Sequence, residues 1–244
     1  MRKTVLATAL AAAAALPGLA SAQATSPHSL SGNMGIFSDY RFRGISQTFQ
    51  QPAIQGGIDY SHSSGFYLGN WNSNVSGESF VDGTIEMDFY GGFKKGFGDV
   101  TLDVGLLQYL YPGAKNAGVR YDTLEAYVGA SWKWFTLKYS MTLDDYFGVT
   151  DSDGSGYLDL SASYELAPKL MLVGHVGKQE VKNASALDYV DYKVGLTYDL
   201  NGWVLGAAYI DTDVDDATYT FNTNAGKAKD LAEGTLVLSI SKSF

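Results

Sequence analysis

Histidine is the side chain most often used for acid–base chemistry near neutral pH, and the chain contains His28, His62 and His175. Only His175 falls within a predicted strand, because the other two fall in an N-terminal extension and a short turn. A hydrolase on a barrel needs histidine, serine and an orienting polar group at one rim. No such set can be assembled from the sequence. We therefore predict no enzymatic activity and no catalytic residues.

Two acidic segments have the residue types of cation-binding loops. Asp151 to Gly156 begins like a calcium loop, but its twelfth position is Ala162, where a bidentate glutamate is needed. The aspartates of residues 211–216 are explained more simply by a solvated loop than by a bound divalent cation. The sequence contains no Gly-rich phosphate loop and no His-x-x-x-His pair. We predict neither a metal site nor a cofactor.

Charged residues alternate with apolar ones in several segments, as expected for strands with one oily face and one wet face. Arg41 and Arg43 are placed on the predicted first strand, on the same side as Asp39. They are expected to point inward toward acids on neighbouring strands, either as the selecting charges of a pore or as an ion-pair ladder that fills the barrel. The candidate pore-lining residues are Asp39, Arg41, Arg43, Glu86, Asp88, Asp103, Glu125, Lys138, Asp159, His175, Asp191 and Lys193. Because acids outnumber bases in this set, a weak preference for cations is expected.

The elements that must position these residues are strands, because the dominant hydrophobic period is two. Ile85, Met87 and Phe89 form the apolar side of one segment, and Glu86 and Asp88 lie between them. The pattern recurs in residues 100–106, 124–130, 135–143, 158–164 and 190–198. Such segments are close to the roughly 9–11 residues with which a strand crosses a membrane. We predict an all-β fold, a closed antiparallel up-and-down transmembrane barrel of about twelve strands.

The connections between these strands alternate in length. The tight connections are Ser61 to Gly65, Lys94 to Asp99, Trp132 to Trp134, Glu165 to Lys169 and Asp199 to Gly202. The long, polar ones are Asn72 to Asp82, Tyr109 to Val119, Asp144 to Gly154, Lys178 to Leu187 and Asp211 to Asp230. Periodicity alone fits a soluble sandwich equally well. Strict alternation of short and long connections favours an outer-membrane barrel, with short periplasmic turns and longer external loops.

The first residues have the pattern of a secretory signal peptide. Arg2 and Lys3 precede the apolar run Val5 to Leu16, and Ala20-Ser21-Ala22 has the form of a cleavage site. We therefore predict a cleaved signal peptide at residues 1–22, a short periplasmic extension at 23–32 and one barrel domain at 33–244. The predicted location is the outer membrane of a Gram-negative-type bacterium.

Composition excludes several classes of protein. The formal net charge is −9, with no basic cluster, which disfavours binding to nucleic acid. The chain has no cysteine, so disulfides and thiol catalysis are excluded. With 17 Tyr, 12 Phe and 28 Gly beside 5 Pro, the composition is typical of a β-barrel.

Aromatic residues cluster near the predicted strand ends, where the two interfacial girdles of a membrane barrel would lie. Those beside short turns are Tyr60, Trp132, Trp134, Tyr198 and Trp203, and those near loop ends are Trp71, Tyr109, Tyr111, Tyr146 and Phe147. Leu236, Leu238 and Ile240 share a face of the last strand, which ends in Phe244. Bacterial outer-membrane barrels have this ending, and their assembly machinery reads it.

Several motifs, mostly in the first third of the chain, resemble the TorF family of porins. They are Ser31 to Ile36, Ser38 to Thr48, Pro52 to Tyr60, Gly65 to Tyr67, Gly69 to Trp71, Glu86 to Asp88 and Tyr90 to Gly92. The resemblance implies an outer-membrane barrel and does not imply a particular solute.

Two functions remain open. One is a porin or narrow channel for passive diffusion of small hydrophilic solutes or ions. The other is a filled structural, adhesive or lipid-binding barrel without a pore, and a soluble periplasmic barrel for an apolar ligand is a weaker third. Inward positions rich in Gly, Ser and Thr would favour the channel, whereas Tyr and Arg filling the section would favour the filled barrel. The expected partners are outer-membrane lipid and lipopolysaccharide, the barrel-assembly machinery and small hydrophilic solutes. The oligomeric state is not predicted.

Overall fold

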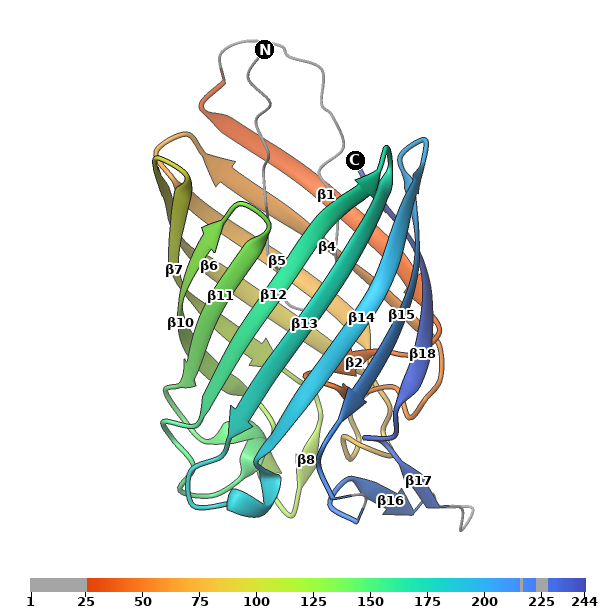
Figure 1. Cartoon of the computed structure of the whole chain (residues 1–244). Coiled ribbons are helices and arrows are strands. Elements are labelled where there is room, and N and C mark those ends of the chain that lie inside the picture. Colours follow the sequence, from red (N-terminus) through yellow and green to blue (C-terminus); the bar gives the residue numbers. More distant parts are fainter. Residues whose placement is uncertain (1–25, 216, 223–227) are drawn as a thin grey trace.

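The computed structural model describes residues 26–215, 217–222 and 228–244, and the predicted signal peptide lies outside them. Within this part of the chain, twelve antiparallel strands close into a barrel (Figure 1). They are β1 (His28–Phe37), β4 (Ala53–His62), β5 (Phe66–Asn74), β6 (Ile85–Phe97), β7 (Val100–Leu110), β10 (Thr123–Trp132), β11 (Phe135–Thr142), β12 (Gly156–Ala167), β13 (Leu170–Glu180), β14 (Tyr189–Leu200), β15 (Trp203–Thr212) and β18 (Thr235–Ser243). The predicted fold class is confirmed. No helix among the described residues is long and apolar enough to cross a membrane.

Each barrel strand pairs with the one before and the one after it, and the barrel closes where β1 pairs with β18. The register at this closure places Asn33 opposite Ser243 and Phe37 opposite Ser239. Closure leaves no free edge, so every strand has hydrogen-bonding neighbours on both sides. β1 begins at His28 rather than at Asn33, and its first residues already pair with β4.

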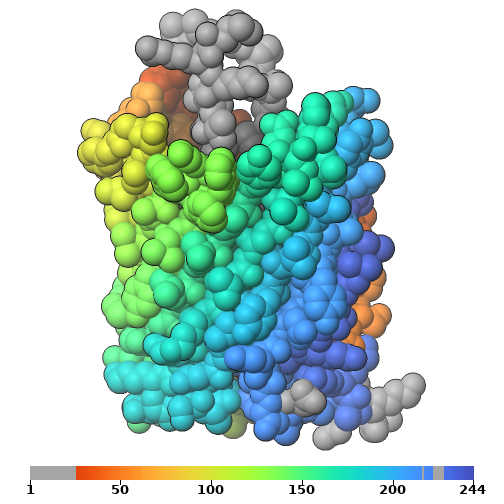
Figure 2. Space-filling view, viewed as in Figure 1, coloured from red at the N-terminus to blue at the C-terminus, as the bar shows by residue number. Residues whose placement is uncertain are grey.

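The outer surface of the barrel is apolar. Ile85 and Phe89 are exposed on β6, whereas Glu86 and Asp88 between them are buried toward the inside. The same alternation holds on β11, where Leu137 is exposed. From the side shown in Figure 2, side chains of the strands form an unbroken wall. The predicted two-sided strands are therefore present, with the oily side outward.

Short and long connections lie at opposite ends of the barrel. The short turns are residues 63–65, 98–99, 133–134, 168–169 and 201–202, at the end where the chain terminates (Figure 1). The long connections are residues 38–52, 75–84, 111–122, 143–155, 181–188 and 213–234. In the turn between β14 and β15, Asn201 and Gly202 have φ of 54° and 87°. Two successive positive φ angles define a type I′ turn, which matches the twist of a hairpin.

Some long connections carry small elements of their own. These are β2 (Arg41–Phe42), β3 (Ile45–Ser46), β8 (Lys115–Asn116), β9 (Val119–Arg120), β16 (Thr220–Asn222), β17 (Ala228–Asp230) and the 3₁₀ turns η1 (Tyr146–Gly148) and η2 (Ser185–Leu187). Most of them stay at the long-loop end, but residues 38–52, here called the inward loop, fold back into the lumen.

The inward loop corrects the prediction that Asp39, Arg41 and Arg43 lie on the first strand. β1 ends at Phe37, and the three residues belong to a small hairpin inside the barrel. Arg43 and Gly44 have φ of 47° and 84°, which turns the chain back on itself. The hairpin is extended on either side of this turn, so it has the same period of two as a wall strand. Periodicity alone therefore cannot distinguish a hairpin inside the barrel from a strand of the barrel wall.

The prediction of two aromatic girdles is confirmed at only one end of the barrel, the end with the short turns. Trp132, Trp134 and Trp203 are 46%, 44% and 42% exposed beside the short turns, as predicted. The aromatics predicted for the loop-end girdle instead pack inside the barrel: Trp71, Tyr109, Tyr111, Tyr146 and Phe147. They do so because the inward loop gives them an apolar core to pack against, which a loop in solvent would not.

Candidate functional site

An aromatic cluster fills the lumen beside the inward loop. Phe42 packs edge-on against Tyr109 and Phe147, with ring centroids 5.6 and 5.5 Å apart. Tyr40 contacts Trp71 in the same way at 5.3 Å. Such edge-to-face pairs contribute beyond their buried area. The cluster therefore anchors the inward loop to the wall formed by β5 and β7.

Next to this cluster, Tyr146 is buried in the connection between β11 and β12. Its ring contacts Phe147, and its backbone N–H donates to Ser152 Oγ at 2.7 Å. Burial raises the pKa of Tyr146 to about 12, so its phenol is neutral at physiological pH.

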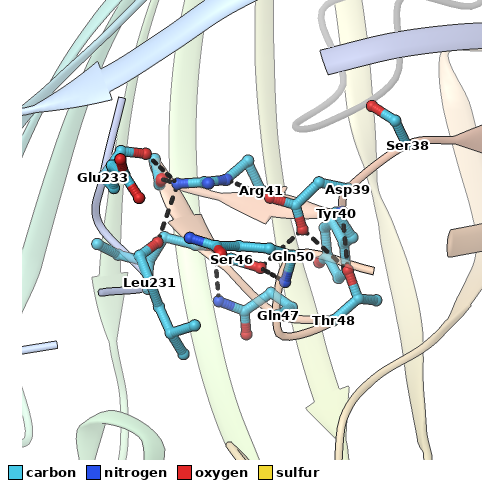
Figure 3. A network of polar contacts seen from close by, with 12 residues as sticks. Ser38, Asp39, Tyr40, Arg41, Ser46, Gln47, Thr48, Gln50, Leu231 and Glu233 are labelled. Atoms are coloured by element: carbon cyan, nitrogen blue, oxygen red, sulfur yellow. Dashed lines mark hydrogen bonds and ion pairs between the residues drawn. The ribbon is translucent and has the colours of Figure 1, made fainter. Parts of the chain in front are cut away.

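A buried ion pair organises the inward loop itself (Figure 3). Arg41 Nε donates to Asp39 Oδ2 at 2.5 Å, and Asp39 Oδ1 accepts from Ser46 and Thr48. Arg41 Nη1 donates to the carbonyls of Gly44, Leu231 and Glu233 at 3.1, 2.9 and 2.9 Å. The guanidinium thereby joins the inward loop to the last long connection, residues 213–234.

Arg43 joins the inward loop to the wall. Its Nη2 donates to both oxygens of Glu125 on β10, at 2.7 and 2.8 Å, and its Nη1 donates to Gln179 Oε1 on β13 at 2.8 Å. The guanidinium also lies over the ring of Tyr157 on β12, 4.2 Å from its centroid. Hydrogen bonds between a guanidinium and a carboxylate are charge-assisted and therefore stronger than neutral ones. The loop is thus tied to three wall strands through one side chain.

Two acids on β6 lie behind the inward loop. Glu86 and Asp88 are both buried, and Glu86 Oε1 accepts a hydrogen bond from Tyr40 at 2.9 Å. Acids on neighbouring strands, such as these two, are the predicted partners of the arginines. The arginines instead pair with Asp39 and Glu125, so the inward loop reaches the β6 acids through a tyrosine.

A histidine lies between two acids on β12 to β14. His175 Nδ1 is 2.9 Å from Asp159 Oδ2, and His175 Nε2 is 2.7 Å from Asp191 Oδ1. Tyr157 donates to the other oxygen of Asp191, and Ser161 donates to the other oxygen of Asp159, each at 2.7 Å. These five polar groups connect the neighbouring strands β12, β13 and β14.

The remaining predicted lumen residues differ in their pairing. Asp103 is 3.4 Å from Lys94 and accepts from Tyr67 at 2.6 Å. Lys138 lies 4.2 Å from the centroid of the Tyr127 ring. Neither Lys138 nor Lys193 has a carboxylate within 4.0 Å among the described residues.

A cavity of about 190 Å³ lies in the lumen between the inward loop and the wall. Of the predicted residues it is lined by Asp39, Arg41, Arg43, Lys138, Asp159, His175, Asp191 and Lys193. Small polar side chains, including Thr136, Ser140, Thr197 and Ser239, complete it. Glu86, Asp88, Asp103 and Glu125 are not part of its lining. Tyr40, Tyr109 and Tyr157 also line it, so both compositions predicted for the lumen, Tyr and Arg on one hand and Ser, Thr and Gly on the other, occur together in the cavity.

Sequence reasoning missed some residues of this site. Tyr157 and Gln179 contact Arg43, and Tyr40 contacts Glu86. Tyr157 and Gln179 could have been found from spacing, since each is an even number of residues from an assigned inward residue, Asp159 and His175. Tyr40 could not, because the alternation puts it on the opposite face from Asp39 and Arg41, and β1 ends before it.

These features define a porin-like β-barrel with an inward loop. The chain belongs to a family described as bacterial proteins of unknown function (Gcw_chp), whose model matches residues 21–244. No curated protein matches the sequence. The resemblance to the TorF family stays a proposal, because the matching family model does not carry that name.

Solved structures of porins share the fold. The KdgM porin matches with a TM-score of 0.56 and 8% identity, over 88% of this chain and 99% of that chain. A KdgM porin in complex with disordered oligogalacturonate matches with a TM-score of 0.54 and 8% identity, over 88% and 98%. The NanC porin matches with a TM-score of 0.53 and 12% identity, over 88% and 99%. At such identities the likeness concerns the fold.

Proposed function

We propose that the chain is a narrow outer-membrane channel for passive diffusion of small hydrophilic solutes or ions, exported by a cleaved signal peptide and without enzymatic activity. The observation that carries the proposal is a closed barrel with an apolar outside, whose polar lumen is narrowed by a loop bonded to its wall. Charged side chains at a narrowing are the usual means of selecting solutes. The porin fold of the similar structures supports this proposal.

A filled barrel is the second candidate, and the aromatic cluster favours it. Tyr40, Phe42, Tyr109 and Tyr111 occupy the section beside the inward loop with almost no exposed surface. If they leave no continuous path, the protein is a structural, adhesive or lipid-binding barrel in the same membrane. Lipopolysaccharide at the outer surface and the assembly machinery at the last strand are proposed partners in both cases.

The expected preference for cations is not supported by the pairing of charges. Asp39 and Glu125 pair with Arg41 and Arg43, and Asp103 pairs with Lys94. Counting acids on the wet face therefore overestimated the negative charge that a solute meets.

Single-channel conductance of the refolded protein in a planar bilayer separates the two candidates. Discrete open steps are expected for a channel. A variant in which residues 40–49 are replaced by Gly and Ser is expected to give larger steps, because Tyr40 and Phe42, the loop members of the aromatic cluster, are removed. Wild-type protein that inserts without conducting, beside a conducting loop variant, identifies the filled barrel. If neither conducts, both the channel and the role given to the inward loop are wrong.

A further inference from the structure

The wall from β11 to β14 holds three cationic groups around the lumen cavity, and the pairing described above does not neutralise all of them. Lys138 is on β11, His175 on β13 and Lys193 on β14, and all three line the cavity. His175 and Lys193 are directly opposite each other in the β13–β14 register.

His175 is an imidazolium in this arrangement. Each ring nitrogen lies within hydrogen-bond distance of a carboxylate oxygen, 2.9 Å from Asp159 and 2.7 Å from Asp191. An ionised carboxylate only accepts hydrogen bonds, so both nitrogens must carry a proton. The geometry places one positive charge between two negative ones.

Each oxygen of the two acids has a closer partner than a lysine, beginning with the His175 nitrogens. Asp159 uses its second oxygen for Ser161, and Asp191 uses its second oxygen for Tyr157. Lys193 faces the imidazolium across the register and has no carboxylate within 4.0 Å among the described residues, and Lys138 contacts an aromatic ring. Like charges directly opposite on a sheet destabilise it. A bound anion would relieve this repulsion.

We propose that Lys138, His175 and Lys193 form a binding site for a small hydrophilic anion in the lumen. The lysines donate to the anion, the imidazolium adds its field, and the hydroxyls of Thr136 and Ser140 supply neutral hydrogen bonds to the rest of the solute. The site rests on the proposed channel function and names its solute class. The cavity lining holds five cationic groups, Arg41, Arg43, Lys138, His175 and Lys193, against Asp39, Asp159, Asp191 and the Glu125 that binds Arg43. It is therefore positive by one charge, unlike the chain as a whole, whose net charge is −9.

Binding to the refolded protein in a neutral detergent tests the site without requiring conduction. Isothermal titration with D-glucuronate and with D-glucose compares solutes that differ by a carboxylate. Glucuronate is expected to bind and glucose to bind far more weakly. Lys193→Gln and Lys138→Gln are each expected to raise the Kd for glucuronate roughly tenfold, as for loss of a charged hydrogen bond. Lys193→Arg is expected to retain binding.

Lys182→Gln is the matched control, because Lys182 contacts Asp153 on the long loops and is exposed. Equal binding of glucose and glucuronate, or lysine variants that bind glucuronate like wild type while folding normally, would overturn the proposal. The bilayer experiment is independent of this result. If glucuronate binds but the protein does not conduct, the anion site is supported and the channel is rejected. If the protein conducts but does not bind glucuronate, the channel is supported and the anion site is rejected.

Discussion

At the scale of single residues, Arg43 connects the inward loop to the barrel wall. Its side chain is buried, and its Nη2 donates hydrogen bonds to both carboxylate oxygens of Glu125. Arg43→Met leaves the Glu125 carboxylate buried without its cation, which is expected to lower the free energy of unfolding by about 3 kcal/mol. Urea unfolding in detergent, followed by tryptophan fluorescence, measures this change. The double variant Arg43→Met/Glu125→Gln should recover part of the loss; if it is no more stable than Arg43→Met, the carboxylate is not the cause.

Gly177 provides a second prediction at this scale. A Cβ at Gly177 would overlap the Tyr157 hydroxyl, which there donates to Asp191. Gly177→Ala is expected to cost about 1–3 kcal/mol of folding free energy, as overpacking usually does. At Gly129 a Cβ meets nothing closer than 3.5 Å, so Gly129→Ala is the control. Equal urea midpoints for the two variants would contradict the packing described for Tyr157.

At the scale of elements, the turn between β14 and β15 depends on left-handed backbone at two successive residues. Asn201 tolerates φ of 54° better than most side chains, so Asn201→Ala is expected to cost about 1 kcal/mol and Asn201→Gly much less. Thermal unfolding of the two variants checks the order. An alanine variant as stable as the glycine variant would mean that the turn changes its conformation at no cost.

The wall strands could be predicted from the sequence, and the inward loop could not. The alternation assigns Glu86 and Asp88 to the inner face, where they are buried, because their neighbours Ile85 and Phe89 must avoid water on the other face. Arg41 has the same spacing of polar and apolar neighbours, but its partners are the carbonyls of Leu231 and Glu233, nearly two hundred residues away. The alternation of polar and apolar residues predicts which face of an extended segment contacts water. It does not predict whether that segment belongs to the barrel wall or folds into the lumen, because this depends on contacts between residues distant in sequence.

At the scale of the whole molecule, the last residue joins the end of the chain to its beginning. Phe244 exchanges backbone hydrogen bonds with Gly32, while its side chain is 74% exposed. Phe244→Ala is therefore expected to leave the urea midpoint of refolded protein nearly unchanged but to lower the amount of folded barrel in outer membranes of cells. Heat-modifiable mobility on gels measures that amount. An equal loss in vitro and in cells would show that the ring acts through stability rather than through recognition by the assembly machinery.

The pairing of β1 with β18 also sets the order of events in the life of the chain. Synthesis delivers β1 first and β18 last, so the two edges that finally meet are separated in time by the whole of translation. Until then each edge exposes unpaired backbone groups that another chain can pair with. Unclosed chains are therefore expected to aggregate more readily than closed barrels, and factors that shield the two edges before closure are expected to raise the yield.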